Sequence, residues 1–367
     1  MKYIYQQPAW PDFFWDERAV APLLAKVRHA QGLLLGRMQA LGFELQREAL
    51  LEVYTLDVLR STEIEGILLH VGQVRSSVAR RLGMDAAGLP KPEREVEGVV
   101  EMTFDAVRNY AEPLDEARLY AWHRALFPEG KSGPYKILTG RWRDDSTGPM
   151  QVVSGAMGKE RVHFQAPAAE RIEEEMRVFL AWFNREEEGL DAVLKAALAH
   201  LWFITIHPFE DGNGRIARAL TDMLLARADG SEQRFYSMSA EIGRRRKAYY
   251  TMLERTQKGD LDVTEWLLWF LDSLRAALDA SEQTLGKVLA KYAFWHRHRT
   301  QSFNPRQQYM LERLLDDFYG KLTTSKWAKM TKCSQDTALR DIQDLLQRGI
   351  LKKSEKGGRS TSYELVV

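Results

Sequence analysis

Cysteine is nearly absent from this sequence, because Cys333 is the only one among 367 residues. A lone cysteine excludes a framework of internal disulfides and any zinc site built from several thiolates. An excess of one charge is also lacking, since 52 Lys and Arg face 51 Asp and Glu for a formal net charge of +1. The net charge therefore gives no overall electrostatic attraction to nucleic acid or to an anionic membrane.

Long apolar runs are missing as well. No stretch approaches the roughly 18 uncharged apolar residues that a membrane-spanning helix needs. The amino terminus reads MKYIYQQPAWPDFFW, with Pro and Asp where a secretory signal needs an apolar run. We therefore expect a cytoplasmic protein without a membrane span. Hydrophobic residues make up 45% of the chain, which is enough for a sizeable core in two or three domains.

Helical periodicity dominates what is present. Apolar residues recur on one helical face in several long stretches, and strict alternation is rare, so a mainly α fold is predicted. Residues 191–206 are apolar nearly all round, which is typical of the buried centre of a helical bundle. The expected helices cover residues 21–41, 46–68, 93–110, 115–126, 168–185, 191–206, 214–228, 244–258 and 264–291.

Two short extended runs interrupt the helices at about residues 149–166. MQVVSG and ERVHFQAP flank the glycine-containing GAMGK, which predicts a β-hairpin. A lone hairpin is not stable by itself, so it must pack on the helices or serve as an edge.

Residues 300–367 have the pattern of a separate unit. A helix over 307–318 is followed by helix, turn and helix, and then by two strands around a Gly-Gly turn, which is the order of a winged-helix domain. The second helix of the pair, residues 334–349, carries Arg340, and the wing is basic. Three aspartates are also expected among the exposed positions of that helix: Asp336, Asp341 and Asp344. DNA contact and protein docking therefore both stay open.

The segment with the most chemical content is HPFEDGNGRIAR, residues 207–218. His207 closes the apolar helix, because the proline that follows disfavours helix at this residue. Asp211 is a hard oxygen ligand of the kind that Mg²⁺ accepts. A zinc site is disfavoured, since His200 and His207 have no further His or Cys nearby.

The Gly-Asn-Gly run at 212–214 allows a close backbone approach and leads into a new helix, whose first N–H groups can bind phosphate. Arg215 and Arg218 are three residues apart, so they share a helix face and can reach the same anion. These residues together indicate phosphoryl or nucleotidyl transfer. A capping histidine and an ordinary glycine turn are the structural alternatives, and the Lys-Ser/Thr ending of a P-loop is missing.

HPFEDGNGRIAR resembles the signature of the Fic (filamentation induced by cAMP) family, which has a His, a Phe, an acidic residue, Gly-Asn-Gly and two arginines at these spacings. The hairpin resembles the flap of that family, and RRRKAYYTMLERTQKGDLDVTEWLLWFL resembles the helices that complete its bundle. The block that starts YIYQQPAWPDFFWD resembles a domain found ahead of Fic cores. The predicted parts are a helical N-terminal domain (1–92), a Fic core (93–290) and a winged helix (300–367).

Fic enzymes typically transfer AMP from ATP to a hydroxyl of a target protein. The resemblance therefore implies a protein adenylyltransferase with ATP as substrate, Mg²⁺ as its metal and a Ser, Thr or Tyr hydroxyl as acceptor. It implies that His207 is the general base, that Asp211 holds Mg²⁺, and that Arg218 reaches the γ-phosphate. The backbone of 212–214 and the Asn213 side chain would form an anion hole. The implied nucleotide-binding residues are Phe209, Gly212, Asn213, Gly214, Arg215, Arg218, Tyr249, Tyr250 and Leu253. The flap residues implied to bind the target main chain are Gln151, Val152, Val153 and Ser154.

The stretch RSTEIEGILL, residues 60–69, resembles the inhibitory motif of one class of this family. The motif has a Ser or Thr, three residues, a Glu, and then Gly or Asn; Ser61, Glu65 and Gly66 occupy its positions here. The resemblance implies that Glu65 pairs with Arg218 and excludes the γ-phosphate. Two alternatives remain, namely removal of AMP from a target and a nucleotide-sensing regulator that binds DNA. Homodimerisation is implied by the resemblance alone.

Overall fold

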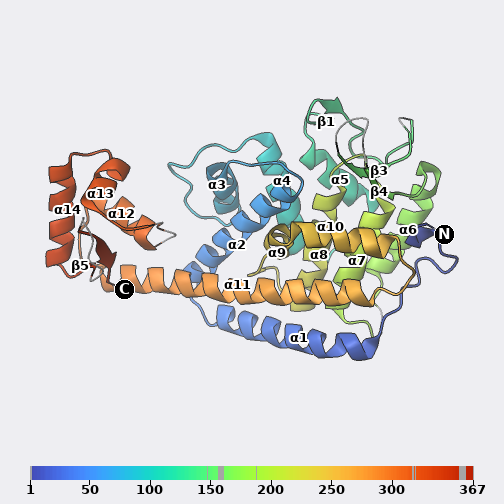
Figure 1. Cartoon of the computed structure of the whole chain (residues 1–367), viewed down its shortest axis with the longest axis horizontal. Coiled ribbons are helices and arrows are strands. Elements are labelled where there is room, and N and C mark those ends of the chain that lie inside the picture. The colour runs from blue at the N-terminus through green and yellow to red at the C-terminus, as the bar shows by residue number, and fades with distance from the viewer. Residues whose placement is uncertain are drawn as a thin grey trace. The chain divides into compact units, whose positions relative to one another are not determined.

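The computed structural model describes residues 2–146, 148–155, 161–186, 188–315, 318, 320–354 and 361–366. The chain forms two compact units, Met1–Glu282 and Gln283–Val367. Each is mainly helical, which confirms the predicted fold class (Figure 1). Within the described residues, no helix combines the length and the apolar character that crossing a bilayer requires.

The first unit is a bundle built around α7 (Ala192–Ile206). Every residue from Val193 to Ile206 is buried, as its uniformly apolar sequence predicts. Its main partner is the next helix, α8 (Asn213–Asp229), and the loop that joins the two is the HPFEDGNG segment. The surrounding helices are α1 (Glu17–Gln39), α2 (Phe43–Ile64), α3 (Val71–Arg81), α4 (Arg94–Arg108), α5 (Glu116–Leu126), α6 (Ile172–Asn184), α9 (Met238–Arg244), α10 (Arg246–Gln257) and α11 (Thr264–Arg297).

Local signals explain where several of these helices begin and end. α1 starts at Glu17, earlier than expected, because the Asp16 carboxylate caps its first turn by accepting from the N–H groups of Arg18 and Ala19. α2 ends at Ile64, because Gly66 has a φ of +82° that a continuing helix excludes. Neither α3 nor α9 was predicted from the sequence. α3 buries Ser76 and Ser77 together with Val74 and Val78, so polar residues interrupt its apolar face.

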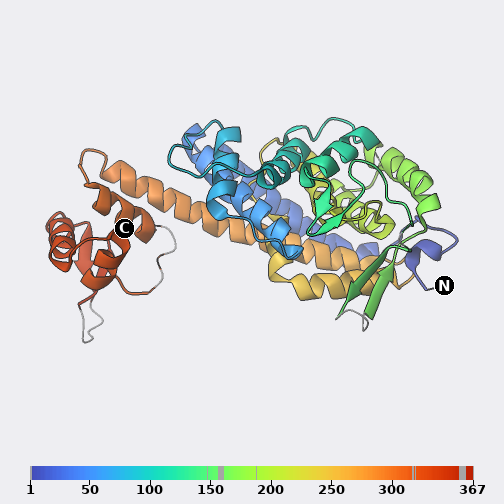
Figure 2. The same ribbon diagram turned by 90° about the horizontal axis from the view of Figure 1, so that it is seen from above.

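The predicted hairpin is present as β3 (Gln151–Ser154) and β4 (Arg161–Gln165), which pair antiparallel. Its expected turn at 155–159 lies outside the described residues except for Gly155. One face of the hairpin packs on the N-terminal segment, which lies beside it in Figure 2. There the Phe164 ring lies edge-on to Tyr3, with ring centroids 5.1 Å apart. A second hairpin, β1 (Lys131–Ser132) with β2 (Tyr135–Lys136), was not predicted.

A buried ionic cluster joins α2 to α8. Arg234 donates to the carboxylate of Asp222 on α8, and Ser237 donates to Asp57 on α2 at 2.6 Å. All four side chains are at most 6% exposed. Burial raises the pKa of Asp222 to about 7, although Arg234 opposes this shift.

Replacing Arg234 with methionine is expected to destabilise the first unit by about 3–5 kcal/mol, because it leaves buried carboxylates without their cation. Arg177→Met is the control, since Arg177 is 67% exposed and, among the described residues, pairs only with the exposed Glu174. Urea unfolding followed by tryptophan fluorescence measures both. A charged carboxylate causes the cost, and loss of Arg234 raises the pKa of Asp222 further above 7. The difference between Arg234→Met and wild type should therefore shrink as the pH falls towards 7 and stay level below it, where Asp222 is protonated in both. Equal stabilities of the two variants would contradict the role of the cluster.

The second unit contains α12 (Pro305–Leu315), α13 (Thr324–Thr331), α14 (Gln335–Gln347) and the antiparallel pair β5 (Leu351–Lys353) and β6 (Tyr363–Leu365). Its core includes Trp327 and Ile342. The Gly-Gly turn lies outside the described residues, and the winged-helix assignment stays a prediction. One expectation for α14 is wrong. Asp341 is only 6% exposed, because Arg306 and Asn304 on the α12 side bind its carboxylate at 2.7 and 2.9 Å.

Candidate active site

The loop between α7 and α8 begins at His207, whose backbone has a left-handed φ of +53°. Residues other than glycine rarely adopt this conformation, and it clusters at functional positions. The buried Arg143 holds it in place, since its Nε donates to the His207 carbonyl at 2.8 Å. Arg143 also donates to the carbonyl of Pro167, just after β4. The turn that carries the histidine is therefore tied to the base of the hairpin.

The imidazole of His207 is arranged to accept a proton. Its Nδ1 lies 3.2 Å from the carbonyl oxygen of Ile204, so Nδ1 carries the hydrogen and Nε2 keeps its lone pair. Burial lowers the pKa of His207 to about 4. The ring is therefore neutral near pH 7, which is the state that a general base requires.

Two buried side chains brace the loop after His207. The Asn213 side chain accepts from the Phe209 N–H at 3.0 Å and donates to the Phe209 carbonyl at 2.8 Å. His123 on α5 accepts from the N–H of Gly140 through Nδ1, so its Nε2 donates to the carbonyl of Asp211 at 3.1 Å. Asn213 was expected to point its side chain at an anion. In the structure its amide contacts the Phe209 backbone, and its part in binding an anion stays a prediction.

Asp211 is the carboxylate that faces this loop. Its Oδ1 accepts from the Gly212 N–H, and its Oδ2 accepts from Ser132 Oγ in the β1–β2 hairpin. Among the described residues, no group of three or more His, Cys, Asp or Glu side chains is placed to hold a metal. A single carboxylate still suits Mg²⁺, which usually takes one or two carboxylates and completes its shell with water and substrate phosphates.

The two arginines of α8 are buried with unfilled hydrogen-bonding capacity. Arg215 is 3% exposed and lies over the ring of Phe127, and neither its Nε nor its Nη2 has an acceptor among the described residues. Nη1 of Arg218, which is 2% exposed, has none either. Buried charged donors without acceptors are costly. Burial accordingly lowers the pKa of Arg215. The arrangement is that of an anion site at the start of a helix.

Glu65 and Ser61 occupy one side of this anion site. Arg218 Nη2 donates to Glu65 Oε1 at 2.8 Å and to the Ser61 carbonyl at 2.7 Å, while its Nε donates to Ser61 Oγ at 2.9 Å. A Cβ added at Gly214 would lie 2.1 Å from Glu65 Oε1. Glycine is therefore required for this approach, and the Glu65 carboxylate lies against the first turn of α8. The α8 N-terminus attracts negative charge, which offsets the unfavourable position of Glu65 at the end of α2.

The three residues implied for adenine binding lie together on α10 but differ in exposure. Tyr249 is 2% exposed and its hydroxyl donates to His200 Nε2 at 2.7 Å. Leu253 is also buried. Tyr250 is 38% exposed, and its hydroxyl lies 3.4 Å from the Ile64 carbonyl at the end of α2. Core packing therefore accounts for Tyr249 and Leu253 as they stand, and Tyr250 offers the accessible ring.

The hairpin is anchored to α10 through a chain of polar contacts. Ser154 Oγ lies 2.6 Å from His163 Nε2, and His163 Nδ1 lies 2.6 Å from Glu254 Oε2. Lys258 also binds Glu254, and its hydrogen bond is the main reason that the pKa of Glu254 falls to about 2. Val153 remains 48% exposed on β3. Strand β3 is thus anchored to α10, and it carries the residues expected to bind a target: Gln151, Val152, Val153 and Ser154.

Sequence reasoning missed Arg143, His123, Ser132, His163 and Glu254, all of which contact the loop or the hairpin. His163 and Glu254 lie in segments whose resemblance to the family was noted, but nothing in the sequence singled out these two side chains, and the other three lie outside any motif. The sequence did indicate that the region containing Ser132 and Arg143 is a polar, glycine-rich loop, and such loops often carry functional residues.

Two family models match this chain. Residues 113–225 match the Fic/DOC family, and residues 3–84 match a domain of unknown function, DUF4172. The chain is 28% identical over 216 residues to protein adenylyltransferase fic-1 of Caenorhabditis briggsae, covering 59% of this chain and 39% of that protein. It is 29% identical over 261 residues to protein adenylyltransferase Fic of Drosophila willistoni, covering 67% and 44%. The chain thus spans less than half the length of these curated relatives.

The fold has a solved counterpart. The crystal structure of a Fic family protein from Desulfovibrio desulfuricans G20 superposes with a TM-score of 0.55 at 20% identity and covers 96% of this chain and 97% of that one. At this level of identity the similarity shows the fold.

Proposed function

We propose that the protein transfers AMP from ATP to a Ser, Thr or Tyr hydroxyl of a target protein, because residues 113–225 match the Fic/DOC family. The observation that carries the proposal is the set of buried arginine donors without acceptors beside a neutral histidine. A triphosphate supplies the missing acceptors, and the target hydroxyl supplies the proton for His207. The naming of curated relatives as protein adenylyltransferases supports the same reaction.

The proposed chemistry uses few groups. Nε2 of His207 takes the proton of the target hydroxyl, whose oxygen forms a bond to the α-phosphorus of ATP. The bond from that phosphorus to the β-bridging oxygen breaks, and pyrophosphate leaves with the electron pair. The first N–H groups of α8 and Arg215 stabilise the negative charge. Asp211 would hold Mg²⁺, which supplies further charge neutralisation when bound.

We also propose that Glu65 inhibits this reaction. Its carboxylate uses the Arg218 donors that the γ-phosphate would need, so ATP would bind with its phosphates displaced. The target main chain would pair with the exposed β3 edge, where pairing sets the position of the hydroxyl without reading the side chains.

Radiolabelled ATP tests the proposed transfer. Full-length protein with Glu65→Gly is incubated with Mg²⁺, cell lysate and ATP labelled on either the α- or the γ-phosphorus. Protein-bound label from the α position alone is the expected result. Label from the γ position would indicate phosphorylation instead, and no label from either position would refute the proposal.

Removal of AMP is the main alternative, and an AMP-bearing target incubated without ATP would release AMP if it were correct. DNA contact through residues 300–367, homodimerisation and a cytoplasmic location stay predictions. A nucleotide-sensing regulator without catalysis is less consistent with a chain in which His207 and Asp211 are both present.

A further inference from the structure

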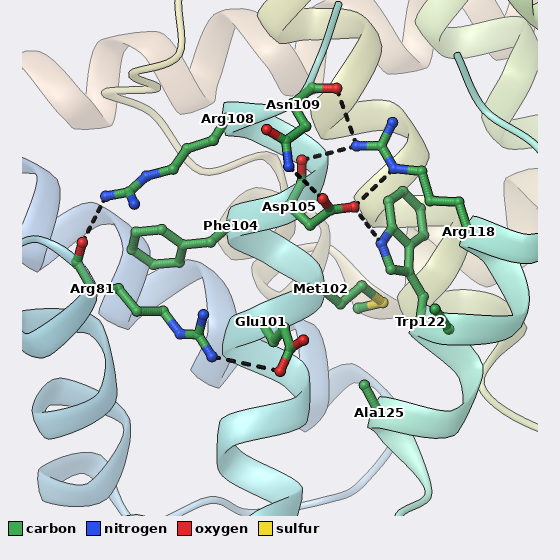
Figure 3. A pocket seen from close by; sticks show the side chains of 11 residues that line it. Arg81, Glu101, Met102, Phe104, Asp105, Arg108, Asn109, Arg118, Trp122 and Ala125 are labelled. Carbon is green, nitrogen blue, oxygen red and sulfur yellow. Dashed lines mark hydrogen bonds and ion pairs between the residues drawn. The ribbon is translucent and has the colours of Figure 1, made fainter. Parts of the chain in front are cut away.

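A cavity of about 550 Å³ opens between α4 and α5 beside the end of α3, and it shares no residue with the loop at 207–214. Phe104, Met102 and Trp122 form an apolar part of its lining, and three arginines surround them. Figure 3 shows the Phe104 ring between the side chains of Arg81 and Arg108. The volume lies within the range of small-molecule sites, which is roughly 300–1,000 Å³.

One of the three arginines is part of the wall. Arg118 Nε binds the Asp105 carboxylate at 2.8 Å, and its other nitrogens donate to backbone carbonyls at 3.0–3.4 Å. Trp122 Nε1 binds the same carboxylate at 2.7 Å. These groups have their partners already, so they shape the cavity rather than attract a ligand.

Arg81 and Arg108 are different. Arg108 donates to the Arg81 carbonyl at 2.7 Å and lies over the Phe104 ring, but it forms no ion pair with any described residue. Arg81 Nη2 lies 3.5 Å from Glu97 and 3.7 Å from Glu101, which is longer than a charge-assisted hydrogen bond. Its Nε is buried without an acceptor among the described residues. Arg108, which has no ion pair among the described residues, and Arg81, which has two long ones, thus flank an aromatic ring.

We propose that this cavity binds a small anion that carries a phosphate or carboxylate next to a flat apolar group. The planar guanidinium groups suit bidentate contact with such an oxyanion. The apolar group of the ligand packs against Phe104 and Met102. Neutral ligands accept no charge-assisted hydrogen bond from Arg108, so they bind more weakly.

The cavity is connected to two elements that contact the candidate active site, because α5 lines it and Phe104 in its lining packs on α2. Phe104 stacks on Tyr54 of α2, with ring centroids 4.5 Å apart, and α2 ends at Glu65. On α5, Trp122 faces the cavity, whereas the next residue, His123, holds the Asp211 carbonyl. A bound anion therefore regulates the Glu65 clamp. This second part of the inference rests on the proposed transfer of AMP, whereas the binding itself does not.

Calorimetric titration of the full chain with phenyl phosphate and benzoate tests the binding. One saturable site for either probe is expected in wild type and in Arg215→Ala, whose substitution lies in the active site. Affinity should fall about tenfold or more in Arg81→Gln/Arg108→Gln, which removes the charge-assisted donors. The matched control is Arg80→Gln, since Arg80 neighbours Arg81 on α3 but does not line the cavity. It should bind as wild type does.

A second variant covers the case in which the arginine pair fails to fold. Ala121 lines the cavity from the exposed side of α5, so Ala121→Trp fills the space without touching the core. It should abolish binding and keep the wild-type melting temperature. Unchanged affinity in the folded variants, or no binding of either probe to wild type, would overturn the proposal.

The regulatory part has its own measurement. Phenyl phosphate should change the rate of AMP self-labelling at least about twofold in wild type and leave Glu65→Gly unaffected, because the latter lacks the clamp. Binding without any change in wild type would refute regulation. Absence of labelling in every form would refute the proposed function and would leave the binding result standing.

Discussion

Glu65→Gly is expected to raise self-labelling with AMP by about ten- to a hundredfold. Arg218 is buried, and its contact with Glu65 is a charge-assisted hydrogen bond of 2.8 Å. Such a partly buried pair contributes roughly 1.5–3 kcal/mol, which corresponds to that range in productive ATP binding. Incorporation of α-labelled AMP per minute, at fixed ATP and Mg²⁺, measures the effect.

The matched control for this substitution is Glu63→Gly. Glu63 lies two residues earlier on the same helix, is 46% exposed and pairs only with Arg60 among the described residues. Glu63→Gly loosens the end of α2 as much as Glu65→Gly does, but it removes no contact with Arg218. An equal rise in both variants would attribute the effect to helix loosening, and no rise in Glu65→Gly would end the clamp hypothesis.

His207→Ala, introduced into the Glu65→Gly form, should lower labelling by about 10²–10⁴-fold, the usual contribution of a general base. ATP binding should be nearly unchanged, because the α8 N-terminus and the arginines remain. Calorimetric titration with ATP checks that the variant is folded and binds. Residual activity within about tenfold of the parent would assign the proton transfer to another group.

The pH dependence of the Glu65→Gly form carries a further test of the same residue. The base must be neutral, and burial lowers its pKa to about 4. Activity should therefore stay level as the pH falls from 8 to 5 and be lost only as it falls through about 4. If the base were an unperturbed histidine, with a pKa of about 6.5, the enzyme would lose half of its activity near pH 6.5. A midpoint of the activity loss near pH 6.5 would therefore contradict a buried, neutral base.

Much of the fold follows from the sequence, because the helical period and the all-apolar α7 are local properties of the chain. The nearness of Glu65 and Arg218 was expected from a resemblance, and the structure places the two in contact. Arg143 and His123 could not be found in this way, because their importance comes from carbonyls that lie far away in the chain. Asn213 shows a further limit. Its identity indicates polar contacts, but the choice between a bound anion and the Phe209 backbone depends on how the loop closes.

Asp341 shows the same limit in the second unit. Its charge led to the expectation of exposure, although its spacing puts it on the same face of α14 as the buried Ala338 and Leu345. The packing of α12 brings Arg306 against it there. Charge counted along one helix therefore overestimates the acidity of its surface, since a neighbouring element can neutralise and cover a carboxylate.

The absence of a side chain at Gly214 has one more consequence. The space beside Gly214 at the start of α8 has room for one anionic group, and the Glu65 carboxylate from the end of α2 occupies it in this structure. A phosphate bound by the same arginine would have to displace it. If Glu65 inhibits as proposed, it acts as a tethered competitor of that phosphate, and its local concentration is set by how firmly α2 packs on the bundle. A substitution that weakens the packing of α2, even one far from Gly214, should shift the equilibrium from bound Glu65 towards bound nucleotide.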